Sequence, residues 1–353
     1  MTKNIISNVR IAGVVSTVPK TIRTLDDDVA SFGEEALKIS ENTGVKKRHV
    51  ATNGECTSDL CLVAGKQLLD KLNWSPDTVG ALIFVTQTPD YILPATACIL
   101  QKALGLTKTC AALDVNLGCS GYVYGLWLAA SLIASGGVEK VLILVGDTIS
   151  HVVSPYDRST AMLFGDAGTA TALEKAQGGA APMFFKLGTD GKGAQNLIVS
   201  AGGFRQPCSI ETKERIGDIQ GNLRGLEDLY MNGPEIFTFV INEIIPLISS
   251  ILTYAGLSIN TVDAFVMHQA NLFMLQYVAK RLNIPAEKIL LTLAEYGNTS
   301  SASIPLTITH HFSGKNRALN TQLVLVGFGV GYSWGAVALS LDSDTILPQV
   351  IIV

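Results

Sequence analysis

The sequence of 353 residues is poor in charge and lacks the charge clusters that mark several classes of protein. Charged residues make up 16% of it, and 26 Lys and Arg nearly balance 30 Asp and Glu, so the formal net charge is -4. No run of five or six like charges occurs, which argues against nucleic-acid binding and against a polybasic membrane patch. At 48% hydrophobic residues the chain is too apolar to be disordered, so it must fold.

Signals for export and membrane insertion are missing as well. The N-terminus leads into alternating residues, without the apolar segment and cleavage site of a secretory signal. The longest apolar stretches, such as residues 141–145 and 350–353, fall far short of the ~20 residues that a transmembrane helix needs. We therefore expect a soluble, cytoplasmic protein with no membrane insertion.

The cysteines form no CxxC pair and stand near no histidine at zinc-finger spacing. This argues against a metal site and a disulfide framework, so we expect reduced thiols. A buried free cysteine is often just a small hydrophobic residue. Inert packing is therefore the simplest interpretation of each of the six, at positions 56, 61, 98, 110, 119 and 208.

The sequence contains an approximate copy of itself. Residues 75–86 recur as residues 258–269, and residues 141–146 recur as residues 322–327 at nearly the same offset. Such an internal repeat predicts two similar halves of about 180 residues each.

We place the boundary between the halves near residues 175–181, where two glycines and a proline interrupt the pattern. The N-terminal half is then residues 1–178 and the C-terminal half is residues 179–353.

Short β-branched apolar runs alternate with segments of helical periodicity in both halves. Buried strands are predicted at residues 81–86, 141–146, 264–267 and 323–327. Helices are predicted at residues 57–72, 236–254, 272–282 and after Ser120. Two α/β halves packed together predict a layered α/β/α/β/α sandwich.

Cys119 lies in a glycine-flanked turn between a predicted strand and a predicted helix. The free N–H groups and the dipole at a helix N-terminus favour an anion there, so we expect a lowered thiol pKa. The flanking glycines also let a substrate approach the backbone. These features make Cys119 a candidate nucleophile, with inert packing as the alternative.

His268 and Asn298 are weaker candidates on their own. His268 follows a predicted strand, at the end of the sheet where α/β proteins place their ligands. Asn298 lies in a turn of small residues that leads into a helix, a common place for a helix cap. A structural role remains open for each.

Several motifs together resemble one family. They are Gly-Cys-Ser-Gly at residues 118–121, His-Gln-Ala-Asn at residues 268–271, Gly-Asn-Thr-Ser-Ser-Ala-Ser at residues 297–303, and the glycine-rich residues 327–335. The sequence around Arg158 fits as well. Along nearly its whole length the chain resembles the β-ketoacyl-acyl carrier protein synthase III family, whose thiolase-like fold has the duplication described above.

The resemblance implies a decarboxylative Claisen condensation, with Cys119, His268 and Asn298 as the catalytic residues. Cys119 would take an acyl group from a thioester. His268 and Asn298 would stabilise the enolate formed when a malonyl thioester loses carbon dioxide, and the backbone N–H groups of Cys119 and Val330 would form the oxyanion hole. Coenzyme A or phosphopantetheine thioesters are substrates in this scheme, and it needs no cofactor or metal.

The resemblance further implies a homodimer and an acyl carrier protein as partner. By the same match Leu93 is the residue that a dimer partner inserts into the acyl pocket. Substrate or carrier contacts are implied for Arg158, Asn271, Leu93, Lys280 and Arg281.

The chain departs from the family at the donor site. Lys38 and Asn42 stand near the positions of a Trp and an Arg that hold coenzyme A, and Phe273 stands where an Arg often meets the carrier protein. We therefore expect weaker binding of coenzyme A than in the family, which favours a carrier-bound donor.

Two other functions stay open. One is an acyltransferase that uses Cys119 as a relay and passes the acyl group to a hydroxyl or amine, with His268 as base. The other is a catalytically silent subunit of a heterodimer, which an intact Cys-His-Asn set argues against.

Overall fold

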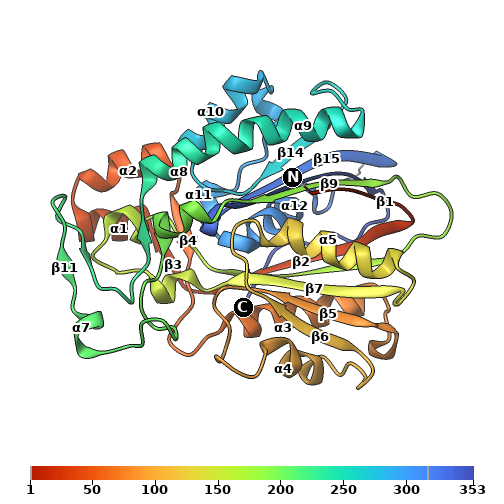
Figure 1. The fold of residues 1–353 in the computed structure, drawn as a ribbon, viewed down its shortest axis with the longest axis horizontal. Coiled ribbons are helices and arrows are strands. Elements are labelled where there is room, and N and C mark those ends of the chain that lie inside the picture. The colour runs from red at the N-terminus through yellow and green to blue at the C-terminus, as the bar shows by residue number, and fades with distance from the viewer. Residues whose placement is uncertain (1, 316–317) are drawn as a thin grey trace.

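The computed structural model describes residues 2–315 and 318–353. Two β-sheets lie one above the other, with helices between them and on both outer faces (Figure 1). This arrangement confirms the predicted α/β/α/β/α sandwich.

The sheet of the N-terminal half has six strands. Their order is β17 (Ile351–Ile352), β2 (Val9–Val18), β8 (Ala167–Lys175), β7 (Lys140–Asp147), β5 (Ala81–Val85) and β6 (Ala111–Val115). Central strands β5 and β7 are buried almost throughout, which explains their continuous apolar sequence.

The sheet of the C-terminal half has five strands. Their order is β1 (Thr2–Ile6), β9 (Met183–Thr189), β16 (Ser333–Asp342), β15 (Asn320–Gly329) and β14 (Ala264–Met267).

Strand pairing confirms the internal repeat. In the first sheet β5 pairs with β7 in parallel and β7 pairs with β8 in antiparallel fashion. In the second sheet β14, β15 and β16 pair in the same way. The repeated sequences therefore form equivalent strands.

Helices fill the space between and outside the sheets (Figure 1). The inner layer holds α5 (Gly121–Ala134) and α12 (Ser303–Phe312). The outer face of the first sheet carries α3 (Thr57–Lys71) and α4 (Thr96–Ala103), and that of the second carries α8 (Gly233–Phe239), α9 (Ile245–Ala255) and α10 (Leu272–Leu282).

One helix corrects the expectation about membrane-spanning segments. A π-helical turn at Val240–Ile244 joins α8 and α9 into one helix of 23 residues, Gly233–Ala255, which is long and apolar enough to cross a bilayer. The sequence predicts this helix over residues 236–254, but not its bilayer-spanning length, because single polar residues divide its apolar runs. Its inner side, including Val240, Leu247 and Ile251, is fully buried in the core beside the second sheet.

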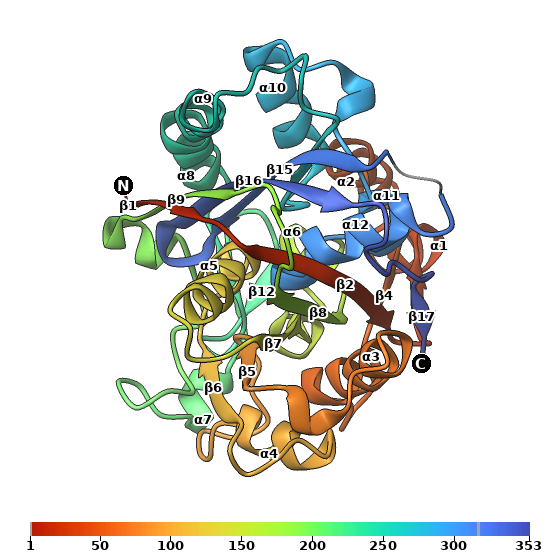
Figure 2. The ribbon, with the colours of Figure 1, turned by 90° about the vertical axis from the view of Figure 1, so that its right-hand side faces the viewer.

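The two ends of the chain each join the sheet of the opposite half. Strand β1 pairs with β9 in the second sheet, and β17 pairs with β2 in the first (Figure 2). The boundary between residues 1–178 and 179–353 stays a prediction.

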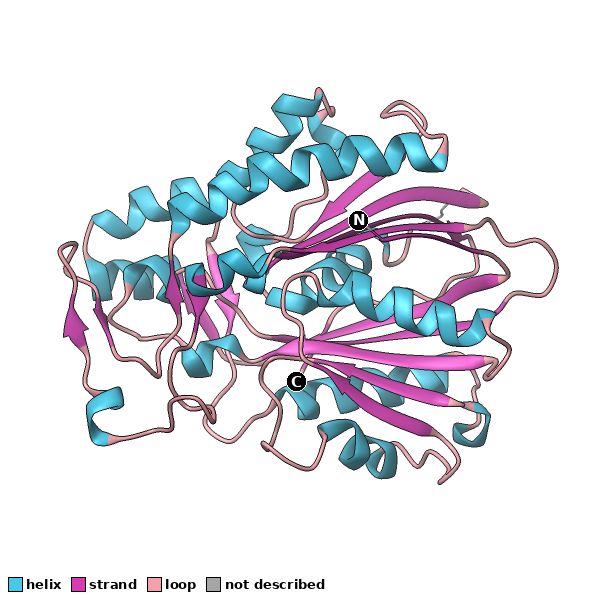
Figure 3. Cartoon of the chain, in the orientation of Figure 1, coloured by secondary structure: helices cyan, strands magenta, loops and turns pink. Residues whose placement is uncertain are grey.

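The remaining elements lie mainly at one end of the sandwich, together with the long connection of residues 201–229, which we call the strap (Figure 3). The strap contains α7 (Ile210–Lys213), β11 (Ile216–Gly217) and β12 (Leu223–Arg224). The other short elements are β3 (Ile22–Thr24), α1 (Leu25–Phe32), α2 (Glu35–Thr43), β4 (Lys47–His49), α6 (Arg158–Ala161), β10 (Leu197–Ile198), β13 (Tyr230–Met231) and α11 (Leu293–Tyr296).

Candidate active site

Cys119 lies at the start of α5, as the sequence predicts. Ser120 is the residue before the helix, and Cys119 precedes it in the turn after β6. The side chain is 4% exposed. Gly329, at the end of β15, passes so close that a Cβ there would lie 2.8 Å from the Cys119 Sγ. A glycine is needed at this position because the second sheet packs directly against the sulfur.

Burial corrects the expected pKa of the thiol. Removal from water raises the pKa of Cys119 to about 11, although the Ser300 hydroxyl and two backbone N–H groups lower it. The nearby carboxylate of Asp147 raises it further. The helix start is present, but desolvation outweighs it, so the thiol is protonated at neutral pH.

The two backbone N–H groups are those of Val330 and of Cys119 itself. Val330 follows β15 in the turn Val330–Tyr332, and both groups are directed at the Cys119 sulfur. An acyl group on that sulfur would place its carbonyl oxygen near these donors. The predicted oxyanion hole thus has a suitable location, and its role stays a prediction.

A cavity of about 630 Å³ reaches Cys119. Most of its wall is apolar, and Ile149, Phe164 and Leu197 are among the residues that form it. Residues 201–203 of the strap close another part of the wall. A cavity of this size and polarity suits an acyl chain, because apolar walls with a few polar groups are typical of ligand sites.

His268 directly follows β14 and is 2% exposed. Its ring packs edge-on against Phe328, next to the glycine that contacts Cys119. Burial lowers the pKa of His268 to about 3, so the imidazole is neutral near pH 7.

The other partner of His268 is Ser303, whose Oγ lies 2.8 Å from Nδ1. The same hydroxyl donates to the Ser300 carbonyl at 2.8 Å, which leaves its oxygen free to accept from Nδ1–H. If the hydroxyl turns toward Nδ1 instead, the proton moves to Nε2. The imidazole can therefore offer Nε2 either as a base or as a donor.

Asn298 is 4% exposed, and its carboxamide has a defined orientation. The Oδ1 accepts the Ser300 backbone N–H at 2.9 Å, while Nδ2 lies 3.4 Å from the Ala270 carbonyl. Since this second contact is long, Nδ2 keeps donor capacity for another group. Asn298 therefore caps the turn through Oδ1 and presents a hydrogen-bond donor through Nδ2. The structural role and the candidate catalytic role are compatible in one side chain.

Comparisons with known proteins agree with this geometry. Residues 113–191 match the model of 3-oxoacyl-[acyl-carrier-protein (ACP)] synthase III, and residues 252–341 match that of its C-terminal part. The β-ketoacyl-[acyl-carrier-protein] synthase III of Symbiobacterium thermophilum is 34% identical over 94% of this chain and 97% of its own. The chain belongs to the β-ketoacyl-acyl carrier protein synthase III family.

Two solved structures extend the match to three dimensions. A 3-oxoacyl-(acyl-carrier protein) synthase from Burkholderia xenovorans LB400 has a TM-score of 0.93 and 45% identity, covering 99% of this chain and 98% of its own. The priming β-ketosynthase of the R1128 polyketide pathway has a TM-score of 0.83 and 25% identity, covering 96% and 98%. The synthase III fold is therefore confirmed over nearly the whole chain.

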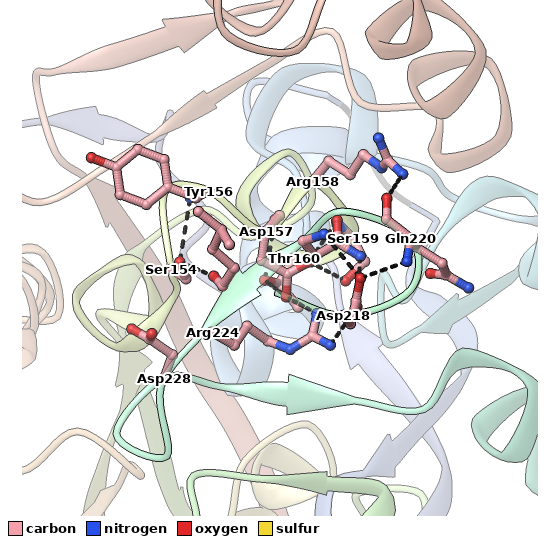
Figure 4. Close-up of polar contacts among 12 residues, drawn as sticks. Ser154, Tyr156, Asp157, Arg158, Ser159, Thr160, Asp218, Gln220, Arg224 and Asp228 are labelled. Atoms are coloured by element: carbon pink, nitrogen blue, oxygen red, sulfur yellow. Dashed lines mark hydrogen bonds and ion pairs between the residues drawn. The ribbon is translucent and has the colours of Figure 1, made fainter. Parts of the chain in front are cut away.

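Arg158, which the family resemblance assigns to coenzyme A, is already engaged in this synthase III homologue. Its guanidinium pairs with the Glu35 carboxylate of α2 at 2.7 Å. It also donates to the backbone carbonyl of Gln220 in the strap (Figure 4). Both contacts would have to open or be shared before Arg158 could bind a phosphate.

A buried ion pair holds the strap in place. Asp157 is completely buried and pairs with Arg224 of the strap at 2.9 Å, and Arg224 also reaches Asp218 at 2.7 Å (Figure 4). Asp218 in turn accepts from the backbone and side chain of Asn222. This network could not be predicted from the sequence, because Asp157 and Arg224 are far apart in the chain.

The other residues that the resemblance singled out do not line the cavity. Leu93 is 77% exposed beside Tyr91 and Ile92, so within one protomer it is away from Cys119. Asn271 caps α10 by accepting the Met274 N–H.

The outer helices present the predicted charges to solvent. Lys280 and Arg281 are exposed in the last turn of α10, and Arg281 donates to the Tyr277 hydroxyl. Lys38 and Asn42 are exposed on α2. Their binding roles stay predictions.

Sequence reasoning missed Ser300 and Asp147. Ser300 contacts Cys119, with its Oγ 3.9 Å from the sulfur, and Asp147 is a fully buried carboxylate that binds the same turn. Ser300 belongs to the motif at residues 297–303, but the motif alone says nothing of which side chain faces the sulfur.

Proposed function

We propose that this protein catalyses a decarboxylative Claisen condensation of an acyl thioester with a malonyl thioester, giving a 3-oxoacyl product. The reaction would serve fatty-acid initiation or a specialised acyl pathway. One observation carries the proposal: Cys119 opens onto an apolar cavity, beside the turn that orients Asn298 and contacts His268. Relatives named as synthase III favour condensation over an acyl relay or a silent subunit.

In the first half-reaction Cys119 needs a base, since its pKa is about 11. Neutral His268 can take the thiol proton on Nε2. The thiolate then attacks the acyl carbonyl, the N–H groups of Cys119 and Val330 stabilise the oxyanion, and the donor leaves as a thiol with the proton from His268.

In the second half-reaction the malonyl thioester loses carbon dioxide and becomes an enolate. A tautomer change by proton exchange with solvent, with the Ser303 hydroxyl turned toward Nδ1, would place the His268 proton on Nε2. His268 and the Asn298 carboxamide would then donate to the enolate oxygen. The enolate carbon attacks the acyl-cysteine carbonyl, and collapse of that oxyanion releases the 3-oxoacyl product and restores the Cys119 thiolate. Reprotonation of the sulfur completes the cycle.

An acyl carrier protein is the partner that we propose for this reaction. The exposed positive charges of Lys280 and Arg281 suit an acidic protein surface. Arg158 is occupied by Glu35 and the strap, and α2 offers Lys38 in place of an aromatic ring, so a donor that lacks an adenine nucleotide is favoured.

We also propose a homodimer in the cytoplasm. The exposed loop of Tyr91, Ile92 and Leu93 gives an apolar surface for a second copy, next to the sheet that ends at β6. All six cysteines are free, as suits a reducing compartment.

The test is to incubate the purified protein with matched acyl-coenzyme A and acyl-carrier donors, record its intact mass, and then add malonyl-carrier. We expect an acyl adduct that disappears with release of carbon dioxide and a 3-oxoacyl product. Transfer of the acyl group to a hydroxyl or amine without carbon dioxide would establish the relay instead. A protein that accepts no acyl group from any donor would be a silent subunit.

A further inference from the structure

Ser300 lies where the three candidate catalytic residues meet. Its backbone N–H donates to Asn298 Oδ1 at 2.9 Å. Its carbonyl accepts from Ser303, the hydroxyl that contacts His268. Its own hydroxyl lies 3.9 Å from the Cys119 sulfur, with 2% of the residue exposed. A single residue therefore touches Cys119 and Asn298 directly and contacts His268 both through its own carbonyl and through the Ser303 hydroxyl.

The backbone of Ser300 has an uncommon conformation. Its φ is +48°, in the left-handed region that residues with a Cβ rarely adopt. The chain holds it there through the Asn298 contact on one side and the Ser301 contacts to Asp147 on the other. Strained residues that the surroundings hold in place are often found at functional sites.

Asp147, at the end of β7, fixes this turn from the other half of the molecule. Its carboxylate accepts from the Gln87 N–H at 2.7 Å, the Thr86 hydroxyl at 3.2 Å and the Ser301 hydroxyl at 2.6 Å. The Ser300 hydroxyl also donates to it. Full burial raises the pKa of the Asp147 carboxyl, and the hydrogen bonds from these donors act in the opposite direction by stabilising the carboxylate.

The Ser300 hydroxyl therefore has two neighbours that can use its one hydrogen. A hydroxyl donates once and accepts up to twice, so while it donates to Asp147 it can only accept from the Cys119 thiol. A thiolate cannot donate, and it attracts any hydrogen-bond donor in reach. Asp147 on β7 is the titratable group that acts on this sulfur, and His268 packs against Phe328, whose neighbour Gly329 contacts Cys119.

We propose that Ser300 is a catalytic residue, whose hydroxyl turns from Asp147 to the Cys119 sulfur when the thiol loses its proton, while Asp147 is a positioning residue that competes for the same hydrogen. The inference deepens the proposed function and rests on it for the step that it serves. The thiol proton goes to His268, and Ser300 keeps its own proton throughout. Apart from this proton transfer, the only bonds that form and break are those of acyl transfer to sulfur.

The experiment measures alkylation of Cys119 by iodoacetamide, followed by peptide mass, in the full chain without any acyl donor. Ser300→Ala should slow alkylation at pH 8 by about tenfold to a hundredfold, the worth of one hydrogen bond to a charged group. Ser301→Ala is the matched control, because it removes a hydroxyl that donates to the same carboxylate but keeps the Ser301 backbone N–H that holds the turn. It should leave the rate near that of the wild type.

Two more variants separate chemistry from folding. Ser300→Gly suits a φ of +48° and lacks the hydroxyl, so it should fold at least as well as the wild type and still react slowly. Asp147→Asn removes the competing charge and should react faster than the wild type. A general loosening of the site would change the alkylation rates of these two variants in the same direction.

Equal rates for Ser300→Ala, Ser301→Ala and the wild type would overturn the proposal, and so would slower alkylation in Asp147→Asn. The readout needs no acyl donor and no malonyl thioester. Failure of the proposed condensation in the donor assay would therefore be seen separately from failure of this inference.

Discussion

In each half of the molecule a turn leads into a helix that lies between the two sheets. The turn before α5 carries glycines and one sulfur, and backbone N–H groups are its main polar contribution. The turn before α12 carries an amide and several hydroxyls, bound to one another and to Asp147. The duplication thus places a turn at the same location in each half. The first turn carries the candidate nucleophile, and the second carries the groups that orient or assist it.

The largest effect is expected from removing the sulfur of the first turn. Cys119→Ala should abolish the acyl adduct completely, because the hydroxyl of Ser120 in the same turn is bound to the Ser333 hydroxyl at 2.6 Å. Intact mass after incubation with the preferred donor measures this, and Cys110→Ala is the matched control, as Cys110 is also buried in the same half. An adduct that persists in Cys119→Ala, or maps to Cys208, would contradict the assignment.

Changes in the second turn should separate the two half-reactions. Asn298→Ala should still form the acyl-enzyme but lose decarboxylation by about 10²–10³-fold, the usual worth of one oxyanion donor. The measurements are acyl-enzyme formation by mass and carbon dioxide release from malonyl-carrier.

His268→Ala should differ from Asn298→Ala in its effect on the first half-reaction. From sequence alone both residues act only after acylation, but a thiol with a pKa of about 11 requires a base in the first step too. His268→Ala should therefore slow acylation at pH 7 and recover part of the rate as the pH rises toward 11. If Asn298→Ala impaired both steps equally, the acyl-relay function would be favoured.

The smallest expected effect concerns the outer surface of the second half. Replacing Lys280 and Arg281 by Glu should lower kcat/KM for a carrier-bound donor about fivefold, since each exposed charge contact is worth up to ~1 kcal/mol. The reaction with coenzyme A should not change. Steady-state kinetics with one acyl group on both donors test this, and wild-type kcat/KM should be higher for the carrier. Two results together would exclude a preference for the carrier-bound donor. They are a micromolar KM for acyl-coenzyme A and no effect of the charge reversal on the reaction with either donor.

Much of the fold could be predicted because its central elements have strong local patterns. The apolar strands of residues 81–86 and 264–267 were predicted to within a residue or so, and the repeat identified them as equivalents. Strand β17 could not be predicted in this way, because two residues carry no periodicity and their partner on β2 is more than 300 residues away. The helix at Gly233–Ala255 was predicted to within three residues at its start, but its bilayer-spanning length was not recognised, because single polar residues divide its apolar runs.

The candidate site was predictable in composition but not in electrostatics. Motifs identified Cys119, His268 and Asn298, and the helix start beside Cys119 was correct. The pKa of its thiol was wrong in direction, because a sequence shows which helix begins at a residue but not which sheet covers it. Arg158 illustrates the same limit, since its partner Glu35 comes from a helix 123 residues away.

Because each end of the chain pairs with the sheet of the opposite half, the order in which the two sheets can be completed during synthesis is constrained. Strand β1 is synthesised first, but its partner β9 emerges only after residue 182. The sheet of the first half receives its last strand when residues 351–352 leave the ribosome. Neither sheet can be completed by a growing half-chain alone, because non-local pairing must wait for both partners. Two separately expressed fragments, cut between residues 178 and 179, would each lack an edge strand that only the other can provide.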